Sequence, residues 1–301
     1  AENDFYINGV KTSDVETGSL RVMSNGPFEF MEETQVKRSS DAQYGGSLGA
    51  VVNGVLRRGE NHIHGQVWTY LADDALNASP RPYLRLSPLN DEKVEYFPVK
   101  KDDSRAVVPG YYVGGPLIKN KIFFFSGSRP SFGQTKREVK FLRNNLPGSF
   151  SSASRQDFTV NKTDLDLSFR GRPLQLYAAH LYSPLRIRGL LPDQEGTDSP
   201  DVLWPERGFR APSSTVLWKG TYFPANQLTV SVYGGWSYTN FKNTYGLSKG
   251  PSVAYLTSNL GMDGVPRRWQ AVSGQFTPDN FQTRKDIFRR QNIYADALYL
   301  V

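Results

Sequence analysis

One glycine-rich stretch decides the fold, and it reads Tyr44-Gly45-Gly46-Ser47-Leu48-Gly49-Ala50-Val51-Val52-Asn53-Gly54-Val55-Leu56-Arg57-Arg58-Gly59. Glycines open the stretch, where the backbone must turn tightly or approach another backbone. The apolar, β-branched run that follows favours a strand, and a basic pair with a glycine closes it. We therefore expect a sharp turn that leads into a strand, and a change to long amphipathic strands after His64-Gly65.

The same glycines could also be interpreted as a phosphate-binding loop. Such a loop must lead into a helix whose N-terminus holds the anion. Here a strand-forming run follows, and the Gly-Lys-Ser/Thr ending of a phosphate loop is absent. The sequence therefore argues against a nucleotide site.

The bulk properties exclude several classes of protein. The chain has 301 residues, no cysteine and a formal net charge of +7, so neither disulfides nor thiolate metal sites can form. The basic residues are scattered singly and in pairs, which indicates a solvated surface and no nucleic-acid partner. No apolar run is long enough for a membrane helix, whereas strands of a β-barrel alternate and average out to a polar composition.

The ends of the sequence suggest a piece of a longer protein. No signal peptide opens the chain, which begins at Ala1. The last residues, Tyr294–Val301, form an apolar, strand-like run that stops abruptly. We expect further sequence on both sides.

The segment before the glycine-rich stretch predicts a small domain of mixed structure. Asp4–Val10 alternates and contains an Asn-Gly pair, which predicts a strand and a turn. Lys11–Gly26 is polar and predicts a loop. A proline followed by Phe28–Glu33 predicts a short helix, because proline and early acidic residues favour a first turn. Thr34–Lys37 predicts a short strand.

Three of these segments resemble the second half of the plug domain of TonB-dependent outer-membrane receptors: Phe5–Val10, Pro27–Lys37 and Gln43–Asn53. Arg57–Gly65 resembles the junction between plug and barrel in that family. Gly114–Phe125 resembles the first barrel hairpin of its Oar-like branch. The match covers Asp4 to Phe125, and beyond it the likeness is architectural.

Two positions depart from the family pattern. Leu56-Arg57-Arg58-Gly59 stands where Thr-Lys before Ser or Arg and Gly is more frequent, and Asn8-Gly9 stands where Asp-Gly is usual. Neither departure changes the expected fold. The plug motif that the resemblance marks consists of Tyr44, Gly45, Gly46, Gly49, Asn53, Arg57, Arg58 and Gly59.

The resemblance implies a mainly β protein with a small α/β plug. Residues 1–64 would be the C-terminal part of the plug, and residues 65–301 the N-terminal strands and extracellular loops of an antiparallel transmembrane β-barrel. This barrel would be incomplete, because the large plugged barrels have 22 strands. The implied location is the bacterial outer membrane.

The resemblance also implies a function. The complete protein would take up an unknown extracellular substrate with energy from the TonB complex, which would contact a segment upstream of Ala1. Its other partner would be outer-membrane lipid, and no cofactor is implied. Oar-like relatives are also linked with adhesion and protein export.

The rest of the chain can be compared with the physics of barrels. Outer-membrane barrels alternate short periplasmic turns with long outer loops. Tight turns are expected at Lys119–Lys121, Gly171–Pro173 and Pro224–Gln227, and long connections at 72–110, 129–158, 183–213 and 239–291. The strands between them are expected at Gly65–Leu71, Tyr111–Ile118, Ile122–Ser128, Thr159–Arg170, Leu174–Tyr182, Ser214–Phe223, Leu228–Tyr238 and Asn292–Val301.

Alternation within the strands predicts which face meets lipid. Leu165 and Leu167 alternate with Asp164 and Asp166, and in a barrel the apolar face meets lipid while the polar face lines the lumen. Near the outer strand ends, aromatic residues suit the girdle at a membrane interface. The residues expected in this girdle are Tyr182, Trp236 and Tyr238.

The alternative is a soluble, secreted β-rich adhesion or glycan-binding module, since a sandwich alternates in the same way. Exposed aromatics such as Tyr111, Tyr112 and Trp269 would then be sugar platforms. The alternation of short turns with long loops favours the barrel.

No pattern in the sequence indicates an enzyme or a metal centre. His62 and His64 would share one face of a strand, but no acidic cluster with ligand spacing was found beside them. Asp73-Asp74 and Asp102-Asp103 lack the spaced oxygen ligands of a calcium loop. We expect no catalytic residue and no metal site, and the substrate-binding residues are not identified.

The basic pair Arg57-Arg58 ends the expected plug strand where it meets the barrel wall. We therefore hypothesise salt bridges to lumen carboxylates such as Asp164 or Asp166, which would help to seat the plug. The alternative is an exposed pair without such a role.

Overall fold

The computed structural model describes residues 4–12, 28–38, 50–87, 90–142, 145–198, 200, 204–244, 255–256, 275–276 and 285–300. Strands dominate these residues, and the helical segments are 3-10 turns at Phe28–Phe30 (η1), Asp74–Leu76 (η3) and Trp204–Glu206 (η4). In the described part of the chain, no helix is long and apolar enough to cross a membrane.

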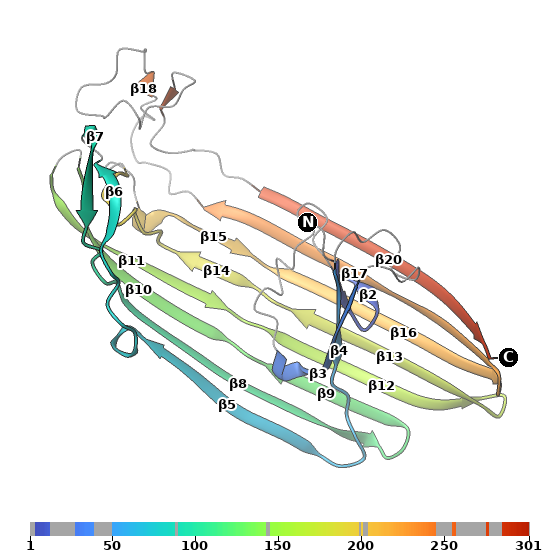
Figure 1. Ribbon diagram of the computed structural model, residues 1–301. Helices are drawn as coiled ribbons and strands as arrows, with labels where there is room; N and C mark the ends of the chain where they lie inside the picture. The colour runs from blue at the N-terminus through green and yellow to red at the C-terminus, as the bar shows by residue number, and fades with distance from the viewer. Residues whose placement is uncertain are drawn as a thin grey trace.

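A small four-stranded sheet, in the order β2-β1-β4-β3, forms the N-terminal part (Figure 1). Its strands are β1 (Asp4–Ile7), β2 (Val10–Lys11), β3 (Met31–Arg38) and β4 (Ala50–Leu56). The turn between β1 and β2 requires left-handed residues, which Asn8 (φ 49°) and Gly9 (φ 81°) supply. The predicted strand and Asn-Gly turn are confirmed.

The predicted helix over Phe28–Glu33 is wrong beyond its first turn. Only η1 is helical, and β3 begins at Met31, three residues before the strand predicted at Thr34–Lys37. Met31 lies opposite Leu56 in the ladder between β3 and β4. Pairing with β4 gives the backbone groups of this segment partners that one isolated helical turn could not supply.

The second unit is a large antiparallel sheet of twelve strands (Figure 1). Its strands are β5 (His64–Asp73), β8 (Asp103–Ile118), β9 (Ile122–Ser128), β10 (Ser131–Lys140), β11 (Pro147–Gln156), β12 (Thr159–Phe169), β13 (Arg172–Tyr182), β14 (Leu185–Arg188), β15 (Gly208–Ala211), β16 (Ser213–Ala225), β17 (Leu228–Thr244) and β20 (Lys285–Tyr299). Two separate hairpins are β6 (Tyr83–Ser87) with β7 (Asn90–Phe97) and β18 (Tyr255–Leu256) with β19 (Gln275–Phe276).

Four pairs of consecutive strands join end to end, so the twelve strands make up eight longer strands. β9 continues into β10, β12 follows β11, β13 continues into β14, and β16 follows β15, each across a break of one or two residues. The register does not change across such a break, since Thr159 lies opposite Ser128 and Gln156 opposite Ser131. The eight strands coincide with the eight predicted from the sequence.

The short turns lie together at one end of the large sheet, as predicted. They connect β8 with β9, β12 with β13, and β16 with β17. Asn120, Arg170 and Gly171 have the positive φ that such turns require. The opposite end carries the long connections and the hairpin of β6 and β7 (Figure 1).

The predicted long connections are shorter than expected, because the strands extend further at this end. Most of 129–158 is strand, as β10 and β11, and β8 begins at Asp103. Both faces of β10 and β11 are rich in polar residues, so hydrophobic alternation could not reveal them. Their ladder of backbone pairs from Ser131–Gln156 to Lys140–Pro147 holds them as strands.

The two sheets share one core. Buried side chains of the small sheet and η1 meet buried side chains on one face of the large sheet. The members are Ile7, Val10, Phe30, Leu56, Phe125, Phe158, Val160, Ala179, Leu181 and Leu217. The opposite face of the large sheet exposes apolar side chains, including Val67, Leu71, Leu167, Phe169, Trp218, Val232 and Ile293.

Candidate functional site

The end of β4 is attached to the β1–β2 turn through two asparagine side chains. Asn8 Oδ1 accepts a hydrogen bond from the backbone N–H of Leu56 at 2.8 Å, and Asn53 Oδ1 accepts one from Gly9 at 3.0 Å. These bonds join residues more than 40 positions apart in the sequence. They fix the direction in which the chain leaves β4 for the large sheet.

Phe30 is the central apolar contact between the sheets. Its side chain is 0% exposed and its ring lies 6.0 Å from Trp68, 6.3 Å from Phe125 and 6.0 Å from Phe158, measured between centroids. Gly127 on β9 leaves room for it, because a Cβ there would lie 2.5 Å from Phe30 Cε1. The short helical turn η1 presents this ring to the large sheet.

A buried ion pair lies beside this aromatic cluster on β12. Lys162 Nζ is 3.1 Å from Asp164 Oδ1, and the two side chains are 7% and 11% exposed. Lys162 also donates to the backbone carbonyl of Leu56 at 3.4 Å. The large sheet therefore contacts a backbone group of β4 through a lysine that the sequence analysis did not single out.

The two arginines at the end of β4 lie in different environments. Arg58 Nη2 lies 2.9 Å from Asp166 Oδ2, which is one of the hypothesised salt bridges, and its guanidinium lies over Phe123. Arg57 lies over the ring of Tyr112 at 5.2 Å. Asp164, the other hypothesised partner, pairs with Lys162 instead.

The linker from Arg57 to Ile63 is held against the tight turn between β8 and β9. Asn61 Nδ2 donates to Asn120 Oδ1 at 2.6 Å, and the backbone N–H of Asn120 donates to Asn61 Oδ1 at 2.8 Å. Gly59 passes so close to β9 that a Cβ would lie 2.3 Å from the carbonyl oxygen of Phe124. A glycine is required at this position for steric reasons.

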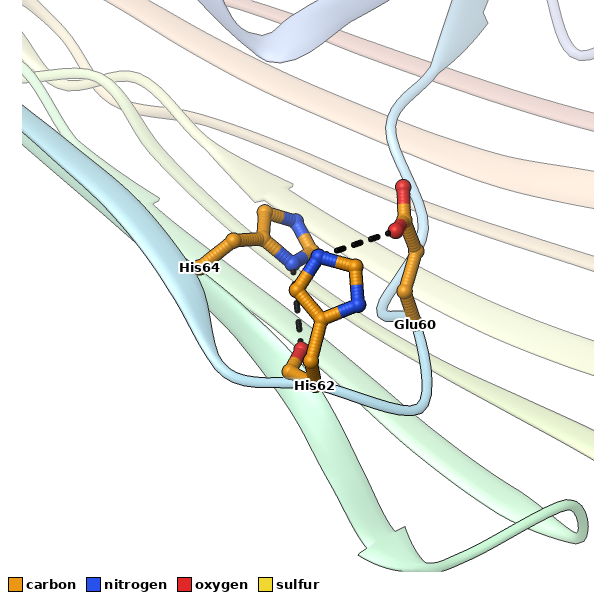
Figure 2. Close-up of side chains that lie close together, drawn as sticks. All are labelled: Glu60, His62 and His64. Carbon is orange, nitrogen blue, oxygen red and sulfur yellow. Dashed lines mark hydrogen bonds and ion pairs between the residues drawn. The ribbon is translucent and has the colours of Figure 1, made fainter.

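Three side chains of the linker region converge (Figure 2). His62 Nε2 lies 3.3 Å from Glu60 Oε2, and the rings of His62 and His64 lie 5.6 Å apart. The sequence analysis considered the two histidines but missed Glu60. The Glu-x-His-x-His spacing was the available signal, since it places three possible metal ligands within five residues.

The long connections at the other end contact one another. Arg137 on β10 makes a two-pronged ion pair with Asp102, with Nη2 to Oδ2 at 2.6 Å, and donates to the carbonyl of Pro192 at 2.8 Å. Arg85 on β6 lies 3.0 Å from Glu195 Oε2. Tyr83 also donates a hydrogen bond to Glu195, which raises the pKa of Tyr83.

The residues of the predicted aromatic girdle lie together. Tyr182 on β13 and Tyr238 on β17 are both opposite Ser214 on β16. Trp236 stacks on Tyr238 with ring planes 4° apart. Their role at a membrane interface stays a prediction.

The predicted plug motif is only partly described. Tyr44, Gly45, Gly46 and Gly49 lie outside the described residues. Arg57, Arg58 and Gly59 lie where the linker meets the large sheet, whereas Asn53 bonds to the β1–β2 turn of the small sheet. No catalytic group was predicted, and the contacts of Phe30, Arg57, Arg58 and Lys162 join the small sheet and the linker to the large sheet.

A family model described as an outer membrane beta barrel domain matches residues 55–173, from the end of β4 into β13. The TonB-dependent transporter Oar of Myxococcus xanthus is 28% identical over 164 residues. Over this part of its length the chain resembles the Oar-like TonB-dependent receptors. These matches place the chain in the bacterial outer membrane.

The match to Oar covers 53% of this chain and 14% of the relative, so the chain spans a small part of the relative's length. Two solved receptors are similar at lower sequence identity. The siderophore receptor PirA from Acinetobacter baumannii has a TM-score of 0.30 at 11% identity, over 82% of this chain and 52% of that one. The ferric-catecholate import receptor Fiu from E. coli K12 has a TM-score of 0.38 at 10% identity, over 100% and 61%.

Proposed function

We propose that residues 1–64 are the C-terminal part of a plug domain and that residues 65–301 contribute the first strands of the surrounding barrel. The supporting observation is the shared core, in which Phe30 and Leu56 of the plug pack on one face of the large sheet. The opposite face exposes apolar side chains, which suits contact with lipid.

In this arrangement the complete receptor takes up a substrate from outside the cell with energy from the TonB complex. The long connections that Arg137 and Arg85 hold together lie at the extracellular side and contribute the substrate-facing surface. The short turns and the linker lie at the periplasmic side. Tyr182, Trp236 and Tyr238 belong to the outer aromatic girdle.

The uptake function is tested with the complete receptor in cells that have or lack an active TonB complex. Accumulation of labelled metal chelates, oligosaccharides and peptides is measured in both strains and in a strain without the receptor. We expect one class of substrate to accumulate only when both receptor and TonB are present. Equal accumulation without TonB would contradict energy-coupled uptake.

We also expect Arg57 and Arg58 to help seat the plug. Replacing both with Ala removes the ion pair with Asp166 and the contacts with Tyr112 and Phe123. Because the Arg58–Asp166 pair is partly exposed, its loss alone costs at most about 1 kcal/mol. Entry of a large glycopeptide antibiotic should nevertheless increase measurably in the double variant.

The matched control for this variant is Arg172→Ala, which removes an exposed arginine that bonds to Asn226 at the turn end, away from the linker. It should leave antibiotic entry at the wild-type level. If the double variant also shows wild-type entry, the basic pair has no role in seating the plug.

A further inference from the structure

We propose that Glu60, His62 and His64 form a site for a divalent transition-metal ion. Their ligand atoms lie within 4.8 Å of one another (Figure 2). Zn²⁺ bonds to nitrogen and carboxylate oxygen at about 2.0–2.2 Å, so ligands around a tetrahedral ion lie about 3.4 Å apart. Glu60 and His62 already have this separation, at 3.3 Å, and a ligand atom of His64 lies within 4.8 Å of both.

The position of His64 is supported by its surroundings on β8. A Cβ at Gly114 would lie 2.8 Å from His64 Nε2, so the glycine leaves room for the imidazole. The ring also lies edge-on to Tyr112, with centroids 6.5 Å apart. On its other side, Nδ1 of His64 is 3.3 Å from the carbonyl oxygen of His62.

Two imidazoles and one carboxylate with open positions suit zinc and related first-row ions better than calcium or magnesium, which prefer oxygen ligands. The pairing of Asn61 with Asn120 holds the linker between two of the ligands. An ion at this site would join the linker to the first residue of β5 and would restrict how the chain leaves the small sheet.

The test is isothermal titration calorimetry of the complete receptor in detergent with Zn²⁺, and with Ca²⁺ for comparison. The wild type should bind one more Zn²⁺ than His62→Gln/His64→Gln, and Glu60→Gln should weaken this binding at least about tenfold.

The matched control is His180→Gln, since His180 bonds to Ser214 on the large sheet and is the third histidine of the chain. This variant should bind Zn²⁺ as the wild type does. Unchanged stoichiometry in the His62/His64 double variant would overturn the proposal.

An independent observation concerns the outward face of the large sheet. A groove of about 580 Å³ crosses β8, β10, β11 and β14, and its charged lining is entirely arginine. The arginines are Arg105, Arg155, Arg186 and Arg188. In the register, Arg186 lies opposite Arg155, and Arg188 lies opposite Ala153, so they form one cluster on the exposed face.

The groove lies just beyond the predicted outer girdle. Arg186 follows Tyr182 by four residues, and β14 continues β13 in the same register. At about 3.3 Å per residue this is about 13 Å along the strand, or about 10 Å along the membrane normal for a strand tilted by about 40°. That distance places the groove at the outer limit of the headgroup layer, which extends about 5–8 Å beyond the hydrocarbon core.

The charges of the groove are only partly neutralised by the protein. Arg105 pairs with Asp73, and Arg155 pairs with Asp157. Among the residues that the structure describes, no carboxylate pairs with Arg186 or Arg188. Guanidinium groups bind phosphate through two parallel hydrogen bonds. We infer that the groove binds the phosphate groups of an outer-leaflet glycolipid, as lipopolysaccharide carries.

The inference is tested by native mass spectrometry of the complete receptor with purified lipopolysaccharide, with its dephosphorylated form, and with inorganic phosphate. Arg186→Gln/Arg188→Gln should lower affinity for lipopolysaccharide at least about tenfold. The dephosphorylated lipid should bind weakly to both proteins. Inorganic phosphate alone should show no comparable binding, because the lipid contributes contacts on the apolar face.

The control for this pair is Arg172→Gln, at the turn end of the same long strand. It should bind lipopolysaccharide as the wild type does. Equal affinity of the Arg186/Arg188 double variant and the wild type, or an equal loss in the control, would overturn the assignment.

Discussion

Replacing Phe30 with Ala should detach the small sheet from the large one. The ring is fully buried among Trp68, Phe125 and Phe158, and truncation of such a residue costs about 3–5 kcal/mol. Part of this cost falls on the contact between the sheets, because the aromatic partners of Phe30 all belong to the large sheet and its connections. In the complete receptor, the variant should show faster proteolysis of the small sheet and increased entry of a large antibiotic.

Phe28→Ala is a closely matched control for this prediction. Phe28 lies in the same helical turn, but its side chain is 75% exposed. Its removal should change neither proteolysis nor antibiotic entry. If both variants behave as the wild type, the aromatic cluster does not hold the sheets together.

Replacing Lys162 with Met should destabilise the receptor by several kcal/mol. The change leaves Asp164 charged, largely buried and without its partner, and breaking one side of a buried ion pair costs about 3–5 kcal/mol. It also removes the bond from Lys162 to the backbone carbonyl of Leu56. The unfolding midpoint of the purified receptor in detergent, measured by thermal denaturation, should fall clearly.

A double substitution distinguishes the effect of an unpaired buried charge on stability from the effect of lost packing. Lys162→Met/Asp164→Leu removes both charges and should recover most of the lost stability, because apolar replacements of a buried pair are often neutral. Arg58→Gln, which breaks the partly exposed pair with Asp166, should cost at most about 1 kcal/mol. Equal losses in Lys162→Met and Arg58→Gln would mean that burial does not distinguish the two pairs.

The long strands could be predicted from the sequence because apolar and polar residues alternate along them, which gives each strand one apolar face. Leu165 and Leu167 alternate with Asp164 and Asp166, and the structure places the two aspartates on the side of the small sheet. The strand extensions at β10 and β11 were missed because neither face is consistently apolar. Their stability comes from pairing with neighbouring strands, which one sequence does not reveal.

The contact between the sheets was predictable only in part. Arg58 and Asp166 were identified from a basic pair at the expected junction and from the polar face of a strand. The role of Lys162 depends on the register that brings β12 to the end of β4, 106 positions away in sequence. Phe30 was expected in a helix, and its importance arises from long-range packing that no local pattern encodes.

The most direct test of the proposed architecture is a disulfide between the two sheets in the complete receptor, formed from Val10→Cys and Gly235→Cys. A Cβ at Gly235 would lie 2.9 Å from Val10 Cγ1, close to the separation of about 3 Å between a Cβ and the distant sulfur of a disulfide. In outer membranes of intact cells, mass spectrometry should find the cross-linked peptide. Val10→Cys with Val232→Cys, on the outward face of β17, should give none. Absence of the first cross-link, or equal formation of both, would contradict the placement of the small sheet on the inner face of the large one.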